Sequence, residues 1–196
     1  MRTQAKLAVA GLCLVALLIA ATPVTADGKY ETIHAVAWGT NSQQGDAIGL
    51  TLIIYDYSTA DDRGILFNAY KKGMNQGLVN ALSKMKAVGH LAVQGTLGYD
   101  VSYIKAIPTP TGRKIRFITN RKITFAEDWS DSQSQSFNLS AGELDINEKD
   151  KSKSVGVLYP AAQLIIDSQG ELQWDLNQNA WKVNTIADWE GKPGEN

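Results

Sequence analysis

The sequence predicts an α+β domain: an antiparallel β-sheet, or a partly closed barrel or sandwich, with one inserted helical hairpin. Three observations carry this prediction. Ile48, Leu50, Leu52 and Ile54 alternate with other residues, as in a strand that buries one face. Between residues 59 and 89 the apolar spacing changes to the three and four residues of a helix. From residue 91 to 189 only short strand-like segments follow, which is typical of an antiparallel barrel or sandwich.

The first half of the domain is expected to hold two strands, at residues 30–38 and 48–57, followed by the two helices of the hairpin. Ser58 and Thr59 before Asp61 and Asp62 predict a helix cap. Lys71-Lys72-Gly73 predicts the end of the first helix. The apolar stripes of the two helices are expected at Ile65, Leu66, Ala69 and Tyr70, and at Leu78, Leu82 and Met85. Of these, Ile65, Leu66, Leu78 and Leu82 are expected to be buried against the sheet and to carry no function.

The second half is expected to hold eight further strands. They are predicted at residues 99–107, 114–119, 122–127, 136–146, 154–159, 163–167, 171–176 and 181–186. Turn residues at 108–112 and 167–170 separate two pairs of them. Within residues 136–146 the apolar positions change from Phe137 and Leu139 to Leu144 and Ile146, so a bulge is expected near Gly142.

The N-terminus has the pattern of a cleavable signal peptide over residues 1–26. Arg2 and Lys6 precede the apolar run 7–21, and Val24-Thr25-Ala26 is a small-residue cleavage site. The run is shorter than a membrane-spanning helix needs. We therefore expect export to the periplasm or the medium, one β-rich domain at residues 27–189, a flexible tail at 190–196, and no transmembrane segment after cleavage.

Charge and cysteine content limit the function classes. Removing residues 1–26 lowers the formal charge from −1 to −3, so no global basic field favours nucleic acid. The single cysteine, Cys13, lies within the expected signal peptide, which leaves the exported domain without disulfides or thiolate metal sites. An exported domain without disulfides suits a bacterial envelope.

Two segments of the chain resemble segments of other proteins. They are Gly112-Arg113-Lys114-Ile115-Arg116-Phe117-Ile118-Thr119-Asn120-Arg121-Lys122-Ile123-Thr124-Phe125 and Gly156-Val157-Leu158-Tyr159-Pro160-Ala161-Ala162-Gln163. In these segments the chain resembles an uncharacterised family of bacterial exported proteins, and the resemblance runs through most of the region after the signal peptide. It implies export and a single domain. It implies no activity, cofactor or catalytic residue.

Residues 113–122 contain five basic side chains. In a strand, Lys114 and Arg116 point to one face, and Arg121 and Lys122 follow shortly after. This basic face is a candidate site for an anionic polymer or phosphate. A solvated strand face with edge-protecting cations explains the pattern equally well.

A second candidate site is the acidic stretch that contains Glu127, Asp128 and Asp131 around Trp129. Aromatic rings stack on sugar faces and carboxylates accept bonds from hydroxyl groups, so the stretch fits a glycan site or a glycan hydrolase. Core tryptophans and a solvated loop are the simpler interpretation.

No other motif specifies a reaction or a cofactor. The chain has two histidines, His34 and His90, too few and too far apart in sequence to predict a metal site. The turn 145–150 resembles a calcium loop but has Lys149 where an oxygen belongs. We therefore expect a non-catalytic exported domain that binds a cell-envelope polymer or a small ligand, or is associated with the envelope. A glycan hydrolase at Glu127, Asp128 and Asp131 is the alternative.

Overall fold

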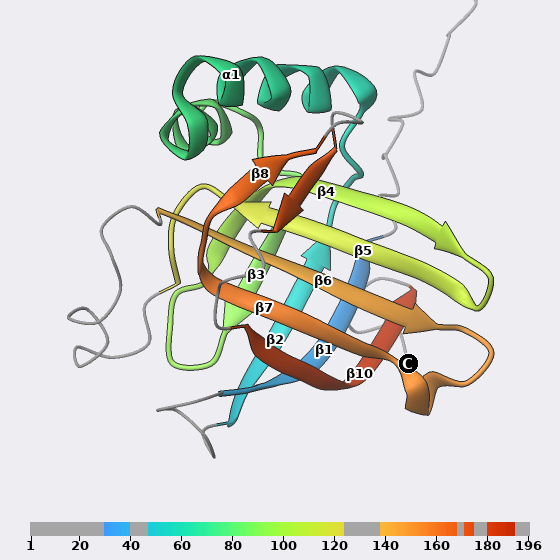
Figure 1. Ribbon diagram of the computed structural model, residues 1–196. Helices are drawn as coiled ribbons and strands as arrows, with labels where there is room; N and C mark the ends of the chain where they lie inside the picture. Colours follow the sequence, from blue (N-terminus) through green and yellow to red (C-terminus); the bar gives the residue numbers. More distant parts are fainter. Residues whose placement is uncertain (1–29, 40–46, 124–137, 168–170, 175–179, 191–196) are drawn as a thin grey trace, which may run out of the picture.

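The computed structural model describes residues 30–39, 47–123, 138–167, 171–174 and 180–190 (Figure 1). Eight antiparallel strands form a closed barrel in the order β1-β10-β7-β6-β5-β4-β3-β2. They are β1 (Glu31–Trp38), β2 (Ala47–Ile54), β3 (Gly89–Val93), β4 (Tyr99–Thr109), β5 (Gly112–Thr119), β6 (Leu139–Asn147), β7 (Val155–Ala162) and β10 (Trp181–Glu190). A short 3-10 helix, η3 (Lys151–Lys153), lies between β6 and β7.

The barrel interior is packed with apolar side chains. Alternate residues of the strands point inward, except where a bulge shifts the alternation, and Ile33, Phe117 and Trp181 belong to this interior core. The ring of Phe117 occupies the space where Gly142 of the neighbouring strand would carry a Cβ atom. A glycine at position 142 is therefore needed for the Phe117 ring to fit.

A second core lies outside the barrel, under α1 (Ala60–Leu82) and a two-stranded sheet of β8 (Leu164–Ile166) and β9 (Leu172–Trp174). Figure 1 shows α1 and this small sheet on one side of the barrel. Leu66, Leu78 and Leu82 are buried there against Tyr103 and Ile118, as predicted for the three leucines. Ile65 is 50% exposed, so its predicted burial is wrong.

The helix begins where the sequence predicts. Thr59 and Asp62 form a reciprocal capping box at its N-terminus. In place of a hairpin of two separate helices, α1 consists of two helical segments that meet at a kink, with non-helical backbone at Gly73 (φ −155°) and Met74 (φ 50°). The break falls at the predicted position, but the second arm continues without an intervening loop.

The sheet is closed, whereas the sequence left open a partly closed barrel or a sandwich. Closure comes from β1, which pairs with β10 along its length, from Glu31 opposite Glu190 to Trp38 opposite Lys182. Strand patterns show which residues alternate but not which distant strands pair. This is why the closed form could not be distinguished from the open ones.

Most predicted strands of the second half are present, with shifted ends, and three details differ. Strand β3 was not predicted, because its five residues begin at Gly89, where the second helix was expected to end. The register shift of β6 against β7 lies between Leu139 and Ala141, two residues before the expected bulge near Gly142. Lys122 and Ile123 are not in a strand, and residues 124–127 lie outside the described residues.

The expected ends of the domain are only partly visible. The signal peptide at residues 1–26 lies outside the described residues, as do residues 191–196 of the expected tail. Glu190, where the tail was expected to begin, still belongs to β10. No helix in the described part of the chain is long and apolar enough to cross a membrane.

Candidate functional site at one end of the barrel

Three charged side chains occupy inward-facing positions at one end of the barrel. Glu31 begins the inward row of β1 that continues with Ile33, and Arg113 begins that of β5. Asp188 lies near the end of β10. Their side chains are 11%, 19% and 13% exposed, respectively. The end of the apolar interior is thus closed by a polar cluster.

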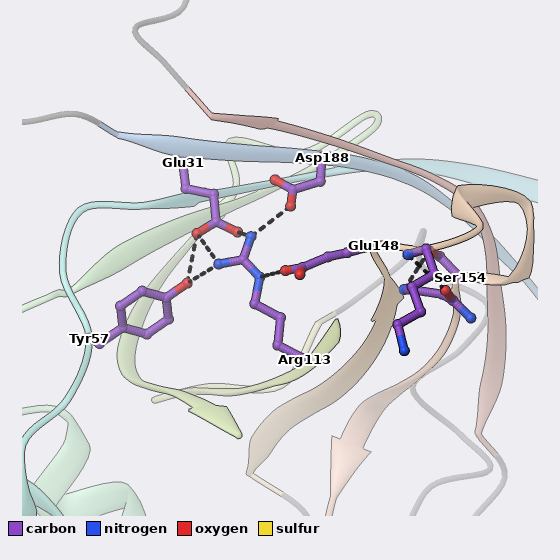
Figure 2. Close-up of polar contacts among 8 residues, drawn as sticks. Glu31, Tyr57, Arg113, Glu148, Ser154 and Asp188 are labelled. Carbon is purple, nitrogen blue, oxygen red and sulfur yellow. Dashed lines mark hydrogen bonds and ion pairs between the residues drawn. The ribbon is translucent and has the colours of Figure 1, made fainter. Parts of the chain in front are cut away.

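Arg113 is the centre of this cluster (Figure 2). Its Nη2 donates to Glu31 Oε1 at 2.9 Å and to Asp188 Oδ2 at 2.7 Å, and its Nη1 donates to Glu31 Oε2 at 3.2 Å. The Tyr57 hydroxyl donates to Glu31 Oε2 at 2.7 Å. Glu148 Oε1 lies 3.5 Å from Arg113 Nε, and this carboxylate is 60% exposed. We call these five residues the Arg113 cluster.

The electrostatics of the cluster follow from partial burial. Burial raises the pKa of the Glu31 carboxyl, and the Tyr57 hydrogen bond and the Arg113 charge oppose that rise only in part. Burial and the neighbouring Glu31 also raise the pKa of Tyr57, which therefore stays a neutral hydrogen-bond donor. For Arg113, burial lowers the pKa, but the two carboxylates outweigh it and the net shift is upward. The single positive charge of Arg113 balances the negative charge of only one of its two nearest carboxylates, Glu31 and Asp188.

Two polar atoms of the cluster are shielded from solvent without a hydrogen-bond partner among the described residues. They are Arg113 Nε and Asp188 Oδ1. A shielded acceptor without a donor costs about 1–3 kcal/mol. The cluster can therefore accept at least one further hydrogen bond at Asp188.

The barrel wall opens beside Asp188. Strand β10 pairs with β7 only from Trp181 to Val183, and beyond this point it pairs with β1 alone. Thr185 has a left-handed backbone (φ 52°) and lies at the register shift that redirects the strand. A β-branched residue rarely adopts this conformation. The redirected end of β10 leaves a gap between itself and the hairpin of β6 and β7.

This gap is a cavity of about 330 Å³, which we call the β7–β10 opening. Ile146, Glu148, Lys151, Ser154, Ile186 and Asp188 line it. Ile146 and Ile186 belong to the interior core of the barrel, whereas Glu148 and Lys151 are exposed. The opening thus combines an apolar inner wall with charged groups at its rim.

The predicted basic face is formed, but acidic residues of β6 neutralise it. Lys114 Nζ lies 3.0 Å from Glu143 Oε1, and Arg116 Nε lies 2.6 Å from Glu143 Oε2. Lys114 also lies 3.6 Å from Asp145. Burial raises the pKa of Glu143, but its bonds to Arg116 and Lys114 outweigh burial and lower it. Acids from a neighbouring strand could not be assigned to these bases from sequence spacing.

The other predicted residues lie elsewhere. Arg121 is not part of the same face: its guanidinium lies 4.7 Å from the ring centroid of Tyr99 and donates to the Gly98 carbonyl. Lys122 is exposed after β5. The acidic stretch lies outside the described residues, and it contains Glu127, Asp128, Trp129 and Asp131.

The residues considered for metals do not converge within the described chain. No group of three or more His, Cys, Asp or Glu side chains is placed to hold a metal ion among the described residues. His34 contacts Thr51 Oγ1 at 2.9 Å, and His90 lies 3.5 Å from Asp100. In the turn with the calcium-like pattern, Asp150 caps η3 and contacts Lys153 at 3.1 Å.

The sequence reasoning missed the Arg113 cluster, although one signal pointed to it. If Lys114 and Arg116 face outward, then Arg113 faces inward with Ile115 and Phe117. A cation on a core-facing row requires a counter-charge. Nothing in the spacing of Glu31 or Asp188 identifies them as that counter-charge, because they come from opposite ends of the chain.

Comparisons with known proteins add no relative: no family model, curated protein or solved structure matches this chain.

Proposed function

We propose that the protein is an exported, non-catalytic binding domain that takes a small ligand at the β7–β10 opening. The observation that carries the proposal is the departure of β10 from β7 after Val183, which leaves a cavity beside the shielded charges, lined by Ile146 and Ile186 of the interior core. Ligand sites in proteins typically have about 300–1,000 Å³ and combine apolar walls with a few polar groups. The opening has this composition and the size for a small molecule.

The contacts of the carboxylates favour binding over turnover. A general acid or base must exchange a proton with the substrate. Glu31 is held by Arg113 and Tyr57, and one oxygen of Asp188 is held by Arg113. These contacts suit a fixed electrostatic environment better than proton transfer.

The N-terminal sequence supports the exported location. Arg2, Lys6, the apolar run 7–21 and Val24-Thr25-Ala26 form the pattern of a signal peptide. The resemblance of residues 112–125 and 156–163 to bacterial exported proteins agrees with this. N-terminal sequencing of the exported protein is expected to begin at Asp27, and exported material that still begins at Met1 would contradict cleavage.

The binding proposal is tested by NMR titration of the protein without residues 1–26 against a set of metabolite-sized compounds. We expect a ligand to shift the amide signals of Ile146, Ser154 and Ile186. Glu148→Trp places a large side chain at the exposed rim and is expected to abolish the shifts. Lys149→Trp is the matched control, because Lys149 is the exposed neighbour that does not line the opening.

Two results would overturn the proposal. One is binding that shifts other surfaces and is unaffected by Glu148→Trp. The other is turnover of a polysaccharide that is lost when Glu127→Gln, Asp128→Asn and Asp131→Asn are combined, which would replace the binding function by a hydrolase.

A further inference from the structure

The β7–β10 opening has more negative than positive groups. Among the described residues at the opening and in the Arg113 cluster, the carboxylates are Glu31, Glu148 and Asp188, and the cations are Arg113 and Lys151. Nearby, Asp150 and Lys153 pair with each other at 3.1 Å and leave this balance unchanged. One carboxylate charge is therefore left without a counter-ion.

We propose that the β7–β10 opening selects a small organic cation, a primary ammonium with a short aliphatic part; this inference rests on the proposed binding function. An ammonium group has three N–H donors and no acceptor. It supplies both what Asp188 Oδ1 lacks, a hydrogen-bond donor, and what the opening lacks, a positive charge. A charge-assisted bond of this kind is about twice as strong as a neutral one.

The opening offers less to an anion or a neutral molecule. An anion would find Lys151 as the cation that lines the opening, with Glu148 and Asp188 opposing it. The Ser154 hydroxyl accepts a bond from the backbone amide of Asn147 at 3.0 Å and keeps its own hydrogen as a donor, but Ser154 is buried and therefore offers little to an anion. A neutral molecule would gain the apolar wall but would leave the surplus carboxylate charge unbalanced.

The apolar wall of the opening favours a ligand that also has an aliphatic part. Ile146 and Ile186 are buried members of the interior core, and both line the opening. A short alkyl chain that leaves water for the cavity beside them is stabilised by about 0.8 kcal/mol per buried methylene. The small volume excludes long chains and favours a ligand of a few carbons.

Access to Asp188 Oδ1 requires a local movement, because this oxygen is shielded in the free protein. Glu148 lines the opening together with Asp188, and its side chain is free to move because it is largely exposed and lies 3.5 Å from Arg113. The carboxylate of Glu148 can then pair with the bound ammonium, which has Asp188 as its first partner. Binding is therefore expected to depend on both acids.

The experiment compares three probes of equal chain length by NMR titration: n-butylammonium, n-butanol and butyrate. We expect n-butylammonium alone to shift the amides of Ile186 and Ser154, with an affinity that falls as salt is raised. Glu148→Gln is expected to weaken binding by about fivefold, the value of one charge contact near 4 Å in water. Lys151→Gln is expected to strengthen it.

Controls separate this effect from folding and from general charge. Asp188→Asn is expected to weaken binding most, but it also alters the Arg113 cluster, so Glu148→Gln at the exposed rim carries the test if Asp188→Asn fails to fold. Asp145→Asn, which removes an acid from the outer face of β6, should leave binding unchanged.

The titration distinguishes failure of the cation selectivity from failure of the proposed binding function. Equal or stronger binding of n-butanol or butyrate at the same amides overturns the cation selectivity and leaves the proposed function standing. Binding of n-butylammonium that is equally sensitive to Asp145→Asn and Glu148→Gln overturns the site. If none of the three probes shifts these amides, the proposed cation selectivity is wrong. If the metabolite-sized compounds of the first titration also leave them unshifted, the proposed binding function is wrong as well.

Discussion

Arg113 and Asp188 are 75 residues apart in the sequence and are joined at 2.7 Å across one end of the barrel. Their strands, β5 and β10, are separated by β6 and β7 in the barrel order. The ion pair therefore spans the interior rather than one strand pair. Together with the bond from Arg113 to Glu31, this ion pair connects β5, which carries the guanidinium, to both β1 and β10.

Replacing Arg113 is expected to destabilise the fold strongly. In Arg113→Met the carboxylates of Glu31 and Asp188 stay largely buried without their cation. Breaking a fully buried pair costs about 3–5 kcal/mol, and the cost here should be lower because about a fifth of the side chain is exposed. Urea denaturation at pH 7 measures it. Lys114→Met, one residue away on the outer face, is the control, and an equal loss in both variants would contradict the role of the cluster.

The loss in Arg113→Met is expected to shrink as the pH falls. Burial already raises the pKa of Glu31 in the folded protein, and removing Arg113 removes an interaction that opposes the rise. A raised carboxyl pKa penalises folding above it, and the penalty fades as the pH falls through it. The difference in unfolding free energy between variant and wild type should therefore be smaller near pH 4.5 than at pH 7. A constant difference would show that the cost is not electrostatic.

Glu143→Gln should remove an acid-sensitive part of the stability. The pKa of Glu143 is lowered in the fold, so its contribution is present above the ordinary carboxyl value and is lost as the pH falls through the lowered one. Hydrogen bonds to charged groups contribute about 1.5–3 kcal/mol, and less where they are partly exposed. Denaturation at pH 7 and pH 3 should show a difference in unfolding free energy between wild type and variant that is smaller at pH 3 than at pH 7. Asp145→Asn, with its longer contact to Lys114, should show a smaller gap at pH 7.

The outer core under α1 should respond selectively to truncation. Leu66→Ala and Leu78→Ala each remove a fully buried side chain and should cost about 2–5 kcal/mol. Ile65→Ala is the matched control on the same helix and should change stability by less than about 0.5 kcal/mol. Thermal or urea unfolding checks both. A large loss in Ile65→Ala would mean that its exposed face is covered in solution.

Thr185→Gly should stabilise the protein. A left-handed backbone costs an ordinary residue about 1–2 kcal/mol, and glycine removes this strain. The greater freedom of glycine in the unfolded chain opposes this stabilisation by about 0.4–1 kcal/mol. A net gain of up to about 1 kcal/mol is expected in urea denaturation. Lys182→Gly, in the regular part of β10, should be destabilising instead. If both glycines destabilise equally, the bend at Thr185 does not carry strain.

Local features of the fold could be predicted from the sequence where one segment determines them. The cap at Thr59, the alternation of β2 and the break at Gly73 each depend on neighbouring residues. Features that depend on two distant segments could not be predicted. Closure of β1 on β10 is one, and the pairing of Lys114 and Arg116 with Glu143 is another.

The candidate site could be predicted least. Arg113 stands on an inward row that the sequence shows, but the opening exists because β10 turns away from β7 at Thr185. A threonine at this position gives no turn signal of its own, since glycine or asparagine is usual for a left-handed residue. The charges of the acidic stretch around Trp129 are adjacent in sequence and therefore predict a site, whereas those of the Arg113 cluster become adjacent only in the fold.

The pairing of β1 with β10 also sets the order in which the protein can fold. The first strand of the described chain has the last strand as one of its two neighbours, so the barrel cannot close before nearly the whole chain has been synthesised. Contacts this distant in sequence slow folding, because the ends of a long loop must meet before they gain any stabilisation. An emerging chain would keep β1 without its β10 partner throughout synthesis. For a protein exported as we propose, this delay would leave the chain unfolded long enough to be threaded across a membrane.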